Sequence, residues 1–430
     1  MDPLKAIRFR ILKSDFIRNV ALLTSGTIFA QALSFGVSPI LSRIYVAEDF
    51  AAFTIYTQIV GIFSILSTLS YSEAIVVPKE ENKARKLSNL AFSLSVLVPL
   101  LLFLFLPIVE KLIIYFAKIE NTKHLYIFLI PISVFLNANR NIINSLFTRT
   151  KNFKGNSKNR VFESILGSLA NIGLGYNGLA SLGLILGNIV AQFSFNGLSL
   201  LSLKRNIRIL DFFQTKIDKL TLSEYKSFPL LNSPILLTDL FLITAMSFSL
   251  SNLFGTYTLG LFAFTLKIIQ TPLTLVSTSI GQVFFKRIAD EVNQNGEYGL
   301  FFRKVFSQLL ILSIVSIFAL KIMGPNLFAI IFGESWREAG VYAGLISPFL
   351  FANFIYKCFY YIPIVANKQK TYFILNTFYS FSLVLGLFVG HYFFQDITKT
   401  FHLISFLAVG ISCLILTWFY RLSKTKVVHK

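Results

Sequence analysis

Five basic side chains of this 430-residue chain lie on or within long apolar segments, where a charge is costly. They are Arg43, Arg140, Lys267, Lys321 and Lys357. At the centre of a membrane helix each would cost about 2.5–3.5 kcal/mol, so each needs a polar cavity, a partner or a route to the surface. Lys267 lies about ten residues, or roughly 15 Å of helix rise, from the start of its segment. It is therefore the foremost candidate for binding an anionic group.

The other four basic side chains lie nearer the ends of their segments. Lys321 and Arg43 are close to one end, from which a long side chain can extend to the membrane surface. For Arg43, this interpretation and a place in a cavity both stay open. Arg140, which lies in a run of asparagines, and Lys357 lie nearer the opposite end, and each is open between a cavity role and interfacial anchoring.

Two carboxylates also lie within the apolar segments. Glu73 is near the end of one segment and Asp239 is near the middle of another. A structural ion pair with a buried cation is one interpretation of both. A carboxylate linked to proton or sodium movement is the other.

Motifs of known catalytic chemistry do not occur in the sequence. It contains no Walker A loop, no HExxH and no GxSxG. Cys358 and Cys413 lie inside apolar segments without metal or redox spacing, which favours simple packing. We therefore expect a protein that is not an enzyme and holds no metal or cofactor, apart from an ion that drives it.

The composition is that of a protein whose main solvent is lipid. Hydrophobic residues make up 54% of the chain and charged residues only 14%, against about 25% charged in soluble domains. The mean hydropathy is +0.67. The net charge of +20 does not point to nucleic acid, because the basic residues are scattered over the loops between apolar segments.

Turn residues and charges divide the chain into twelve apolar blocks, each near the roughly 20 residues that a helical crossing needs. We predict an all-α polytopic membrane protein with spans near 20–44, 53–78, 87–107, 125–147, 161–176, 179–203, 229–251, 257–281, 305–322, 338–365, 372–394 and 399–420.

The basic residues gather on one side of these blocks. Most of the 40 Lys and Arg residues fall in seven stretches that each follow an even number of blocks. Basic residues close to a span resist translocation, so we expect these stretches and both termini to face the cytoplasm. The stretches are 5–18, 79–86, 149–160, 204–226, 286–304, 368–370 and 421–430.

The longest polar interruption, near the middle of the chain, predicts two lobes of six helices each. We expect an amphipathic segment at the inner membrane surface (1–19), an N-lobe (20–203), a cytoplasmic linker (204–228), a C-lobe (229–420) and a cytoplasmic tail (421–430).

Several segments, in their order and spacing, resemble the bacterial oligosaccharide flippases of the Wzx type. This family lies within the multidrug/oligosaccharidyl-lipid/polysaccharide exporter superfamily. The similarity covers nearly the whole chain and is carried by 38–79 (with its Pro, Arg-x-Tyr pair and closing Glu-Ala), TRTKNFK at 148–154, LILGNIVAQ at 184–192, the basic, Pro and Gly-Gln run at 266–285, and IFGESWREAG at 331–340. The chain departs from the family pattern at Ala51 and Ala52, where glycine is usual.

The resemblance implies two six-helix lobes around a central cavity that opens alternately to either side of the bacterial inner membrane. It implies a substrate made of an undecaprenyl-diphosphate-linked oligosaccharide, needed outside for O-antigen, capsule or related polymers. A polysaccharide polymerase and a chain-length regulator are further expected partners. Arg43 and Lys267 match basic positions of the family and Glu73 an acidic one, whereas Arg140 and Asp239 match none.

With that substrate, the charged residues acquire specific roles. We expect Arg43, Lys267, Arg140 and Lys357 to hold the diphosphate or acidic sugars, because a cationic cavity offsets the desolvation of an anion. Polar neighbours that could contact sugar hydroxyls are Tyr56, Gln58 and Gln270, and proton or sodium coupling would fall to Glu73 or Asp239.

Two other functions stay open at this point. A multidrug or cation antiporter of the same superfamily would need carboxylates for its substrates, but basic residues outnumber acids inside the predicted spans. A membrane-bound polysaccharide polymerase or ligase would need a sizeable outer loop with catalytic side chains, and the longest predicted outer segment, 108–124, is short.

Overall fold

In the computed structural model, every regular element of the described residues is a helix. The described residues are 15–117, 124–204, 219–294, 299–366 and 368–424. The predicted amphipathic segment up to residue 14, residues 205–218 of the predicted linker and the tail from residue 425 lie outside them. The prediction of an all-α polytopic fold is confirmed.

Twelve of the helices in the described residues have 20 residues or more, and each overlaps one predicted span. They are α2 (Asp15–Ile44), α3 (Ala47–Thr68), α5 (Glu81–Leu104), α7 (Ile130–Arg149), α8 (Phe153–Tyr176), α9 (Ala180–Lys204), α12 (Ser233–Phe254), α13 (Thr256–Gln294), α14 (Gly299–Phe332), α15 (Arg337–Cys358), α17 (Gln369–Phe394) and α18 (Ile397–Lys424). Ten helices of the described chain are long and apolar enough to cross a membrane, by length and composition alone, and α2 and α8 are not among these ten.

Shorter helices connect the long ones. They are α4 (Tyr71–Ala74), α6 (Leu106–Ala117), η1 (His124–Leu129), α11 (Lys219–Glu224), η2 (Phe228–Asn232), η3 (Glu334–Trp336) and α16 (Tyr361–Val365). Gly255 and Gly333 stand at two of the breaks between helices with φ of 91° and 107°. Glycine adopts this left-handed region without the steric cost that a Cβ brings.

The described chain divides into two compact units. Unit 1 runs to Leu240, except that Phe116 and Ala117 group with unit 2, and unit 2 begins at Phe241. Helix α12 therefore contributes its first residues to unit 1 and the remainder to unit 2.

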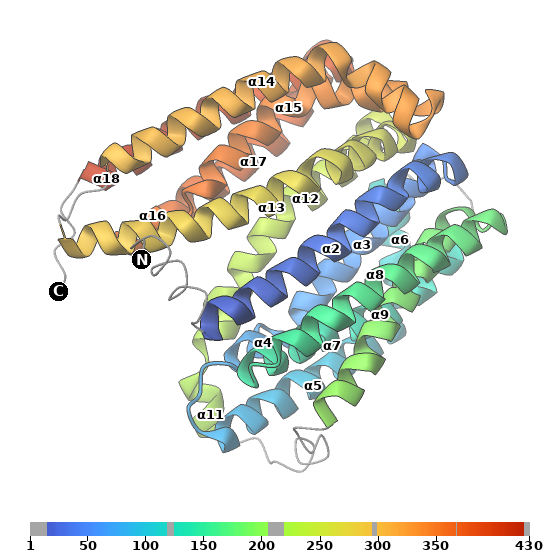
Figure 1. Cartoon of the computed structure of the whole chain (residues 1–430). Helices are drawn as coiled ribbons and strands as arrows, with labels where there is room; N and C mark the ends of the chain where they lie inside the picture. The colour runs from blue at the N-terminus through green and yellow to red at the C-terminus, as the bar shows by residue number, and fades with distance from the viewer. Residues whose placement is uncertain (1–14, 118–123, 205–218, 295–298, 367, 425–430) are drawn as a thin grey trace, which may run out of the picture. The chain divides into compact units, whose positions relative to one another are not determined.

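Within unit 1, α8 packs along α9 on one side and α2 on the other, as Figure 1 shows. Helix α7 packs against α3, α5 and α9. Helix α8 begins at Phe153, well before the predicted span at 161, because the Asn152 side chain caps it by accepting the Gly155 N–H at 3.0 Å. The polar residues that follow this cap are thus helical, and among them Asn156 and Asn159 are buried whereas Lys154 and Lys158 are exposed.

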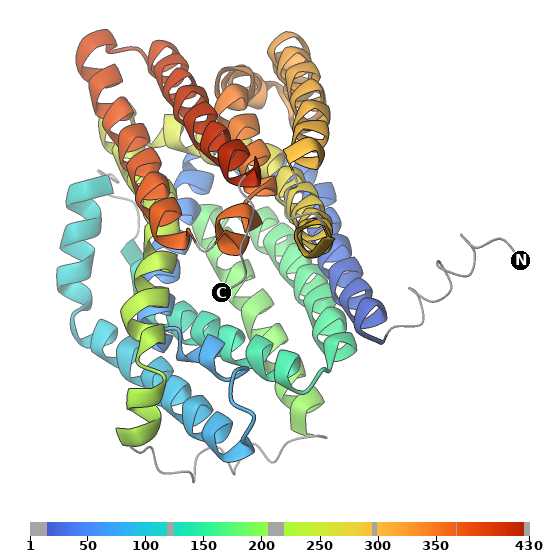
Figure 2. The same ribbon diagram turned by 90° about the vertical axis from the view of Figure 1, so that its left-hand side faces the viewer.

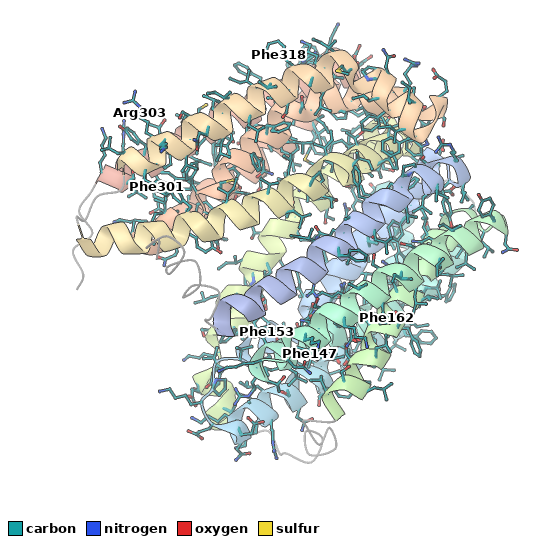
Figure 3. The ribbon with its side chains drawn as sticks, in the orientation of Figure 1. Phe147, Phe153, Phe162, Phe301, Arg303 and Phe318 are labelled. Atoms are coloured by element: carbon teal, nitrogen blue, oxygen red, sulfur yellow. The ribbon has the colours of Figure 1, made fainter. Side chains whose placement is uncertain are left out.

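Within unit 2, α15 packs against α13, α14 and α18, and α17 lies beside α18 (Figure 2). In an apolar stretch within Glu334–Pro363, which contains α15, 78% of the residues are buried, whereas in the corresponding stretch of α14 only 11% are. Phe318 of α14, labelled in Figure 3, points away from the other helices of its unit and is 61% exposed. We assign this face of α14 to lipid, since a bilayer solvates apolar side chains.

Candidate functional site

Three charged side chains of unit 1 meet between α7 and α8. An Arg140 Nη2 nitrogen lies 2.9 Å from Glu163 Oε2. Arg160 and Glu163 are three residues apart on α8, and side chains at this spacing share one helix face. The Glu163 carboxylate thus lies near two guanidinium groups and is bonded directly to that of Arg140.

Arg160 is held by side-chain amides on either side of it. Its Nη2 donates to Asn144 Oδ1 of α7 at 3.1 Å, and its Nε donates to Asn156 Oδ1 at 3.3 Å. Arg140 also lies over the Phe195 ring of α9, with 5.4 Å between the guanidinium carbon and the ring centroid. A cation above an aromatic face is attracted by the electron-rich ring. Both guanidinium groups are therefore fixed in place by α7, α8 and α9.

Arg140, Arg160 and Glu163 line a cavity of about 270 Å³, here called the two-arginine cavity. Its other polar lining comes from α2, α8 and α9, through Thr27, Gln31, Ser34, Ser164, Ser168, Asn171 and Asn188. Among its described lining residues, two carry a positive charge and one a negative charge. The surplus charge favours an anionic ligand.

Buried polar atoms in this cavity lack protein partners. Arg140 Nε, Gln31 Oε1 and Asn171 Oδ1 are buried and form no hydrogen bond with other described residues. Buried polar atoms are nearly always hydrogen-bonded, so such orphans point to a ligand or to water. The Nε donor of Arg140 is suited to an anionic oxygen.

The close approach of α8 to its neighbours gives the cavity a rigid wall. A Cβ at Gly167 would lie 2.7 Å from the Ala191 Cβ of α9. Tyr45 directly follows α2, and its hydroxyl donates to the Asn171 carbonyl oxygen at 2.6 Å. Small residues that let membrane helices approach closely fix the helices against each other.

The remaining predicted site residues of unit 1 have varied surroundings. The exposed Arg43 donates to the Pro39 carbonyl of its own helix at 2.7 Å. Tyr56 is buried, with its hydroxyl 3.0 Å from Leu129 O and 2.6 Å from Ser133 Oγ, and Gln58 is also buried. Their roles toward a substrate stay predictions.

The two predicted acidic residues lie on different helices, Glu73 on α4 and Asp239 on α12. Glu73 is exposed and lines a second cavity of unit 1, where its Oε2 lies 3.4 Å from Asn232 Nδ2. Asp239 belongs to α12, and its side chain lies outside the described residues. Their coupling role therefore stays a prediction as well.

The predicted site residues of unit 2 lie on two helices. Lys267 and Gln270 are half-buried and three residues apart on α13, whereas Lys357 is exposed in the last turn of α15. Thus Arg140 alone of the four predicted basic residues lines the two-arginine cavity.

Arg160 and Glu163 were missed as site residues. Arg160 was assigned from the sequence to the basic stretches that orient the spans, and this assignment was incomplete because its side chain lines a cavity. The available signal was the pair of opposite charges three residues apart at the edge of an apolar block. Because their partner Arg140 comes from another helix, the cluster itself depends on tertiary structure.

Together, the long apolar helices and the charged cavity inside one unit define a multi-pass membrane protein with a polar cavity among its helices. The chain belongs to the polysaccharide biosynthesis protein family, whose model matches residues 40–341. The resemblance to this group of membrane proteins predicted from the sequence is thereby confirmed. A comparison with curated proteins found no match.

Solved structures share the fold over nearly the whole chain. The lipid II flippase MurJ in an inward closed conformation is 14% identical with a TM-score of 0.71, covering 94% of this chain and 90% of that one. An inward-facing multidrug resistance MATE family transporter of the MOP superfamily is 13% identical with a TM-score of 0.62, covering 93% and 94%. An outward-facing MATE transporter is 14% identical with a TM-score of 0.58, covering 96% and 97%.

Proposed function

We propose that this protein is a flippase that moves an undecaprenyl-diphosphate-linked oligosaccharide across the bacterial cytoplasmic membrane by alternating access, with both termini inside. The family supports a role in making polysaccharide. The fold is shared with a lipid II flippase and also with multidrug resistance transporters, so the fold alone does not choose between a flippase and a multidrug transporter.

The observation that carries the proposal is the surplus positive charge of the two-arginine cavity. Arg140 presents a buried Nε without a described partner, and Arg160 lies beside it in the same wall. A diphosphate carries several acceptor oxygens, and guanidinium groups bind such oxygens in a fixed planar geometry. A site for a cationic drug would need a surplus of carboxylates, but Glu163 is already bonded to Arg140.

In the proposed mechanism, Arg140 and Arg160 hold the diphosphate while the polyprenyl chain stays in lipid. Arg43, Lys267 and Lys357 supply further positive charge along the path. Tyr56, Gln58 and Gln270 contact sugar hydroxyls. Charge neutralisation by basic side chains lowers the cost of bringing an anion into a membrane protein.

Deletion of the gene followed by lipid extraction tests the proposal. We expect lipid-linked repeat units to accumulate on the cytoplasmic side, inaccessible to an impermeant glycosidase applied from outside. Arg140→Gln should export less polymer than the wild type at equal protein level, and Arg140→Lys should recover part of that loss. Normal export by both Arg140→Gln and Lys267→Ala would contradict the proposed anion path.

Matched controls keep this result specific. Lys321→Gln removes a positive charge near the predicted outer end of a span and should leave export unchanged. Resistance to cationic drugs that depends on the gene, with no trapped lipid, would favour the multidrug alternative.

Ion coupling forms a separate part of the proposal. We infer that a proton or sodium gradient drives transport through Glu73 or Asp239. Transport in proteoliposomes should then increase when the gradient is imposed and fall in the Glu73→Gln variant. A transport rate that is the same with and without a proton or sodium gradient would contradict the proposed ion coupling without affecting the substrate assignment.

A further inference from the structure

A second cavity in unit 1 has a different chemistry from the two-arginine cavity. It has a volume of about 620 Å³ and lies between α3, α4, α7 and the start of α12. Its described lining holds no Lys or Arg, and Glu73 is its one charged residue. Most of the other polar lining consists of amides and hydroxyls, so we call it the amide cavity.

Three asparagines of α7 line the amide cavity. Asn137, Asn141 and Asn144 are spaced by four and then three residues, which places them on one helix face. Neither the Asn137 nor the Asn141 side chain forms a hydrogen bond with another described residue. Each amide therefore offers two donors and one acceptor to whatever occupies the cavity.

Part of the lining of the amide cavity is apolar. Leu236 and Leu240 of α12 are half-buried and line it. A sugar ring has hydroxyl groups around its edge and C–H groups on its faces, so it needs hydrogen-bonding groups and an apolar surface together. Binding sites that combine an apolar wall with a few placed polar groups achieve both affinity and orientation.

The charge of Glu73 narrows the class of sugar. Its carboxylate is exposed at the rim of the amide cavity. A carboxylate accepts hydrogen bonds from hydroxyl and amide groups, but it repels another carboxylate or a phosphate. The amide cavity is thus suited to uncharged sugars rather than to uronic acids.

One hydrogen bond joins this cavity to the two-arginine cavity. Asn144 lines the amide cavity, and its Oδ1 accepts the Arg160 Nη2 donor, which belongs to the other cavity, at 3.1 Å. In a lipid-linked oligosaccharide the diphosphate and the sugars are covalently joined, so their binding sites must adjoin. We infer that the amide cavity binds uncharged sugar residues of the transported lipid while the two-arginine cavity binds its diphosphate. The inference rests on the proposed function and assigns its glycan subsite.

Equilibrium binding of three lipids to the full-length protein in nanodiscs tests this assignment. The lipids are undecaprenyl diphosphate, undecaprenyl diphosphate carrying one N-acetylglucosamine, and the same carrier with one glucuronic acid. The wild type should bind the N-acetylglucosamine lipid more tightly than undecaprenyl diphosphate. The double variant Asn137→Leu/Asn141→Leu should bind the N-acetylglucosamine lipid roughly tenfold more weakly than the wild type does, a loss equivalent to one or two neutral hydrogen bonds. Affinity for the bare diphosphate lipid should not change.

Variants of neighbouring residues serve as controls. Asn139→Leu removes an amide of the same helix that lines neither cavity and donates to the Phe135 carbonyl at 2.8 Å, so the sugar should tighten binding as in the wild type. Glu73→Gln should improve binding of the glucuronic acid lipid relative to the N-acetylglucosamine lipid.

The possible outcomes separate the two proposals. If the wild type binds none of the three lipids, the proposed function fails. If it binds all three equally, or if the double variant keeps the full gain from the sugar, the diphosphate site stands and the glycan subsite is overturned. A wild type that prefers the glucuronic acid lipid would overturn the assignment to uncharged sugars.

Discussion

The two units use the same long apolar helices but fill their interiors with different chemistry. Between α7, α8 and α9, unit 1 buries guanidinium, carboxylate and amide groups around cavities. Unit 2 buries a series of aromatic rings, in which Phe264 lies 4.1 Å from Trp336 and 5.0 Å from Phe332 between ring centroids. In unit 1 the polar groups line cavities, whereas in this part of unit 2 aromatic rings pack against one another.

The difference has a physical consequence for each unit. Apolar packing between membrane helices gains little from the hydrophobic effect, because lipid is equally apolar. Unit 2 therefore depends on close contact between large rings, and unit 1 depends on ion pairs and hydrogen bonds that also constitute its site. We expect loss of a buried ring in unit 2 to act on stability, and loss of a charged group from the two-arginine cavity to act on stability and binding together.

The largest effect is expected from Trp336→Ala in unit 2. The Trp336 side chain is only 1% exposed. Its removal leaves a cavity among Phe264 and its neighbours and should lower the free energy of unfolding by about 4 kcal/mol. Reversible unfolding of the purified protein in mixed micelles measures this change.

Trp418 of α18 provides the matched control, because it is the second tryptophan of the chain and is only half-buried. Trp418→Ala should cost less than half as much. Equal losses from the two variants would contradict the view that unit 2 is held by its buried rings.

Glu163→Gln in unit 1 should have the next largest effect. It leaves Arg140 and Arg160 without their carboxylate in a cavity wall where the Glu163 side chain is 12% exposed. Since Arg140 is 30% exposed, the cost falls below that of a fully buried pair and should be about 2 kcal/mol. The same variant should bind undecaprenyl diphosphate more tightly, because Arg140 is released from its internal partner.

A more exposed ion pair of unit 1, between Arg149 and Glu81, serves for comparison. Arg149 Nη2 lies 3.0 Å from Glu81 Oε2, and the Glu81 side chain is 57% exposed. Glu81→Gln should cost at most about 1 kcal/mol and leave lipid binding unchanged. If Glu163→Gln weakened binding instead, the carboxylate would belong to the substrate site rather than compete with it.

A smaller effect is expected where two helices of unit 2 cross. A Cβ at Gly324 of α14 would lie 2.7 Å from the Gly340 carbonyl oxygen of α15. Overpacking costs about 2 kcal/mol, and the better helix propensity of alanine returns about 1 kcal/mol, so Gly324→Ala should lose about 1 kcal/mol net. Gly410→Ala, where nothing lies within 4 Å of the added Cβ, should be neutral or stabilising.

The long helices could be predicted from the sequence because a membrane crossing imposes a length and an apolar composition on each. The start of α8 could not, since its polar first turns lower the local hydropathy while the Asn152 cap and the Arg140–Glu163 pair stabilise them. A cap is a local signal and was open to recognition. The ion pair joins residues of different helices, and nothing in their separation along the chain reveals it.

Some residues of the candidate site could likewise be predicted from the sequence, and others could not. Arg140 could be singled out because a charge within an apolar block needs an explanation. Arg160 resembled the loop charges around it, and Asn137 and Asn141 resembled ordinary polar residues of a span. Their places in the cavity linings become visible only in the folded structure, because a cavity is defined by what neighbouring helices leave unfilled.

The smallest predicted effect concerns a helix cap outside the spans of unit 2. Asp396 Oδ1 accepts the backbone N–H groups of Thr398 at 2.7 Å and Lys399 at 3.1 Å, at the start of α18. These bonds, that of Lys399 foremost, hold the pKa of the Asp396 carboxyl below its usual value of 3.8. The stabilisation is therefore fully present above the unfolded-state pKa and is lost as pH falls through the lower folded-state pKa.

Thermal unfolding of Asp396→Ala against the wild type measures this cap. The difference in Tm should stay constant from about pH 8 to about pH 5 and shrink only below the usual pKa of a carboxyl group. Asp396→Asn keeps an oxygen that can cap α18 but does not titrate, so its difference from Asp396→Ala should persist in acid. A wild-type advantage that disappears near neutral pH would show that another group governs this end of unit 2, since a carboxylate bonded by two N–H groups stays ionised there.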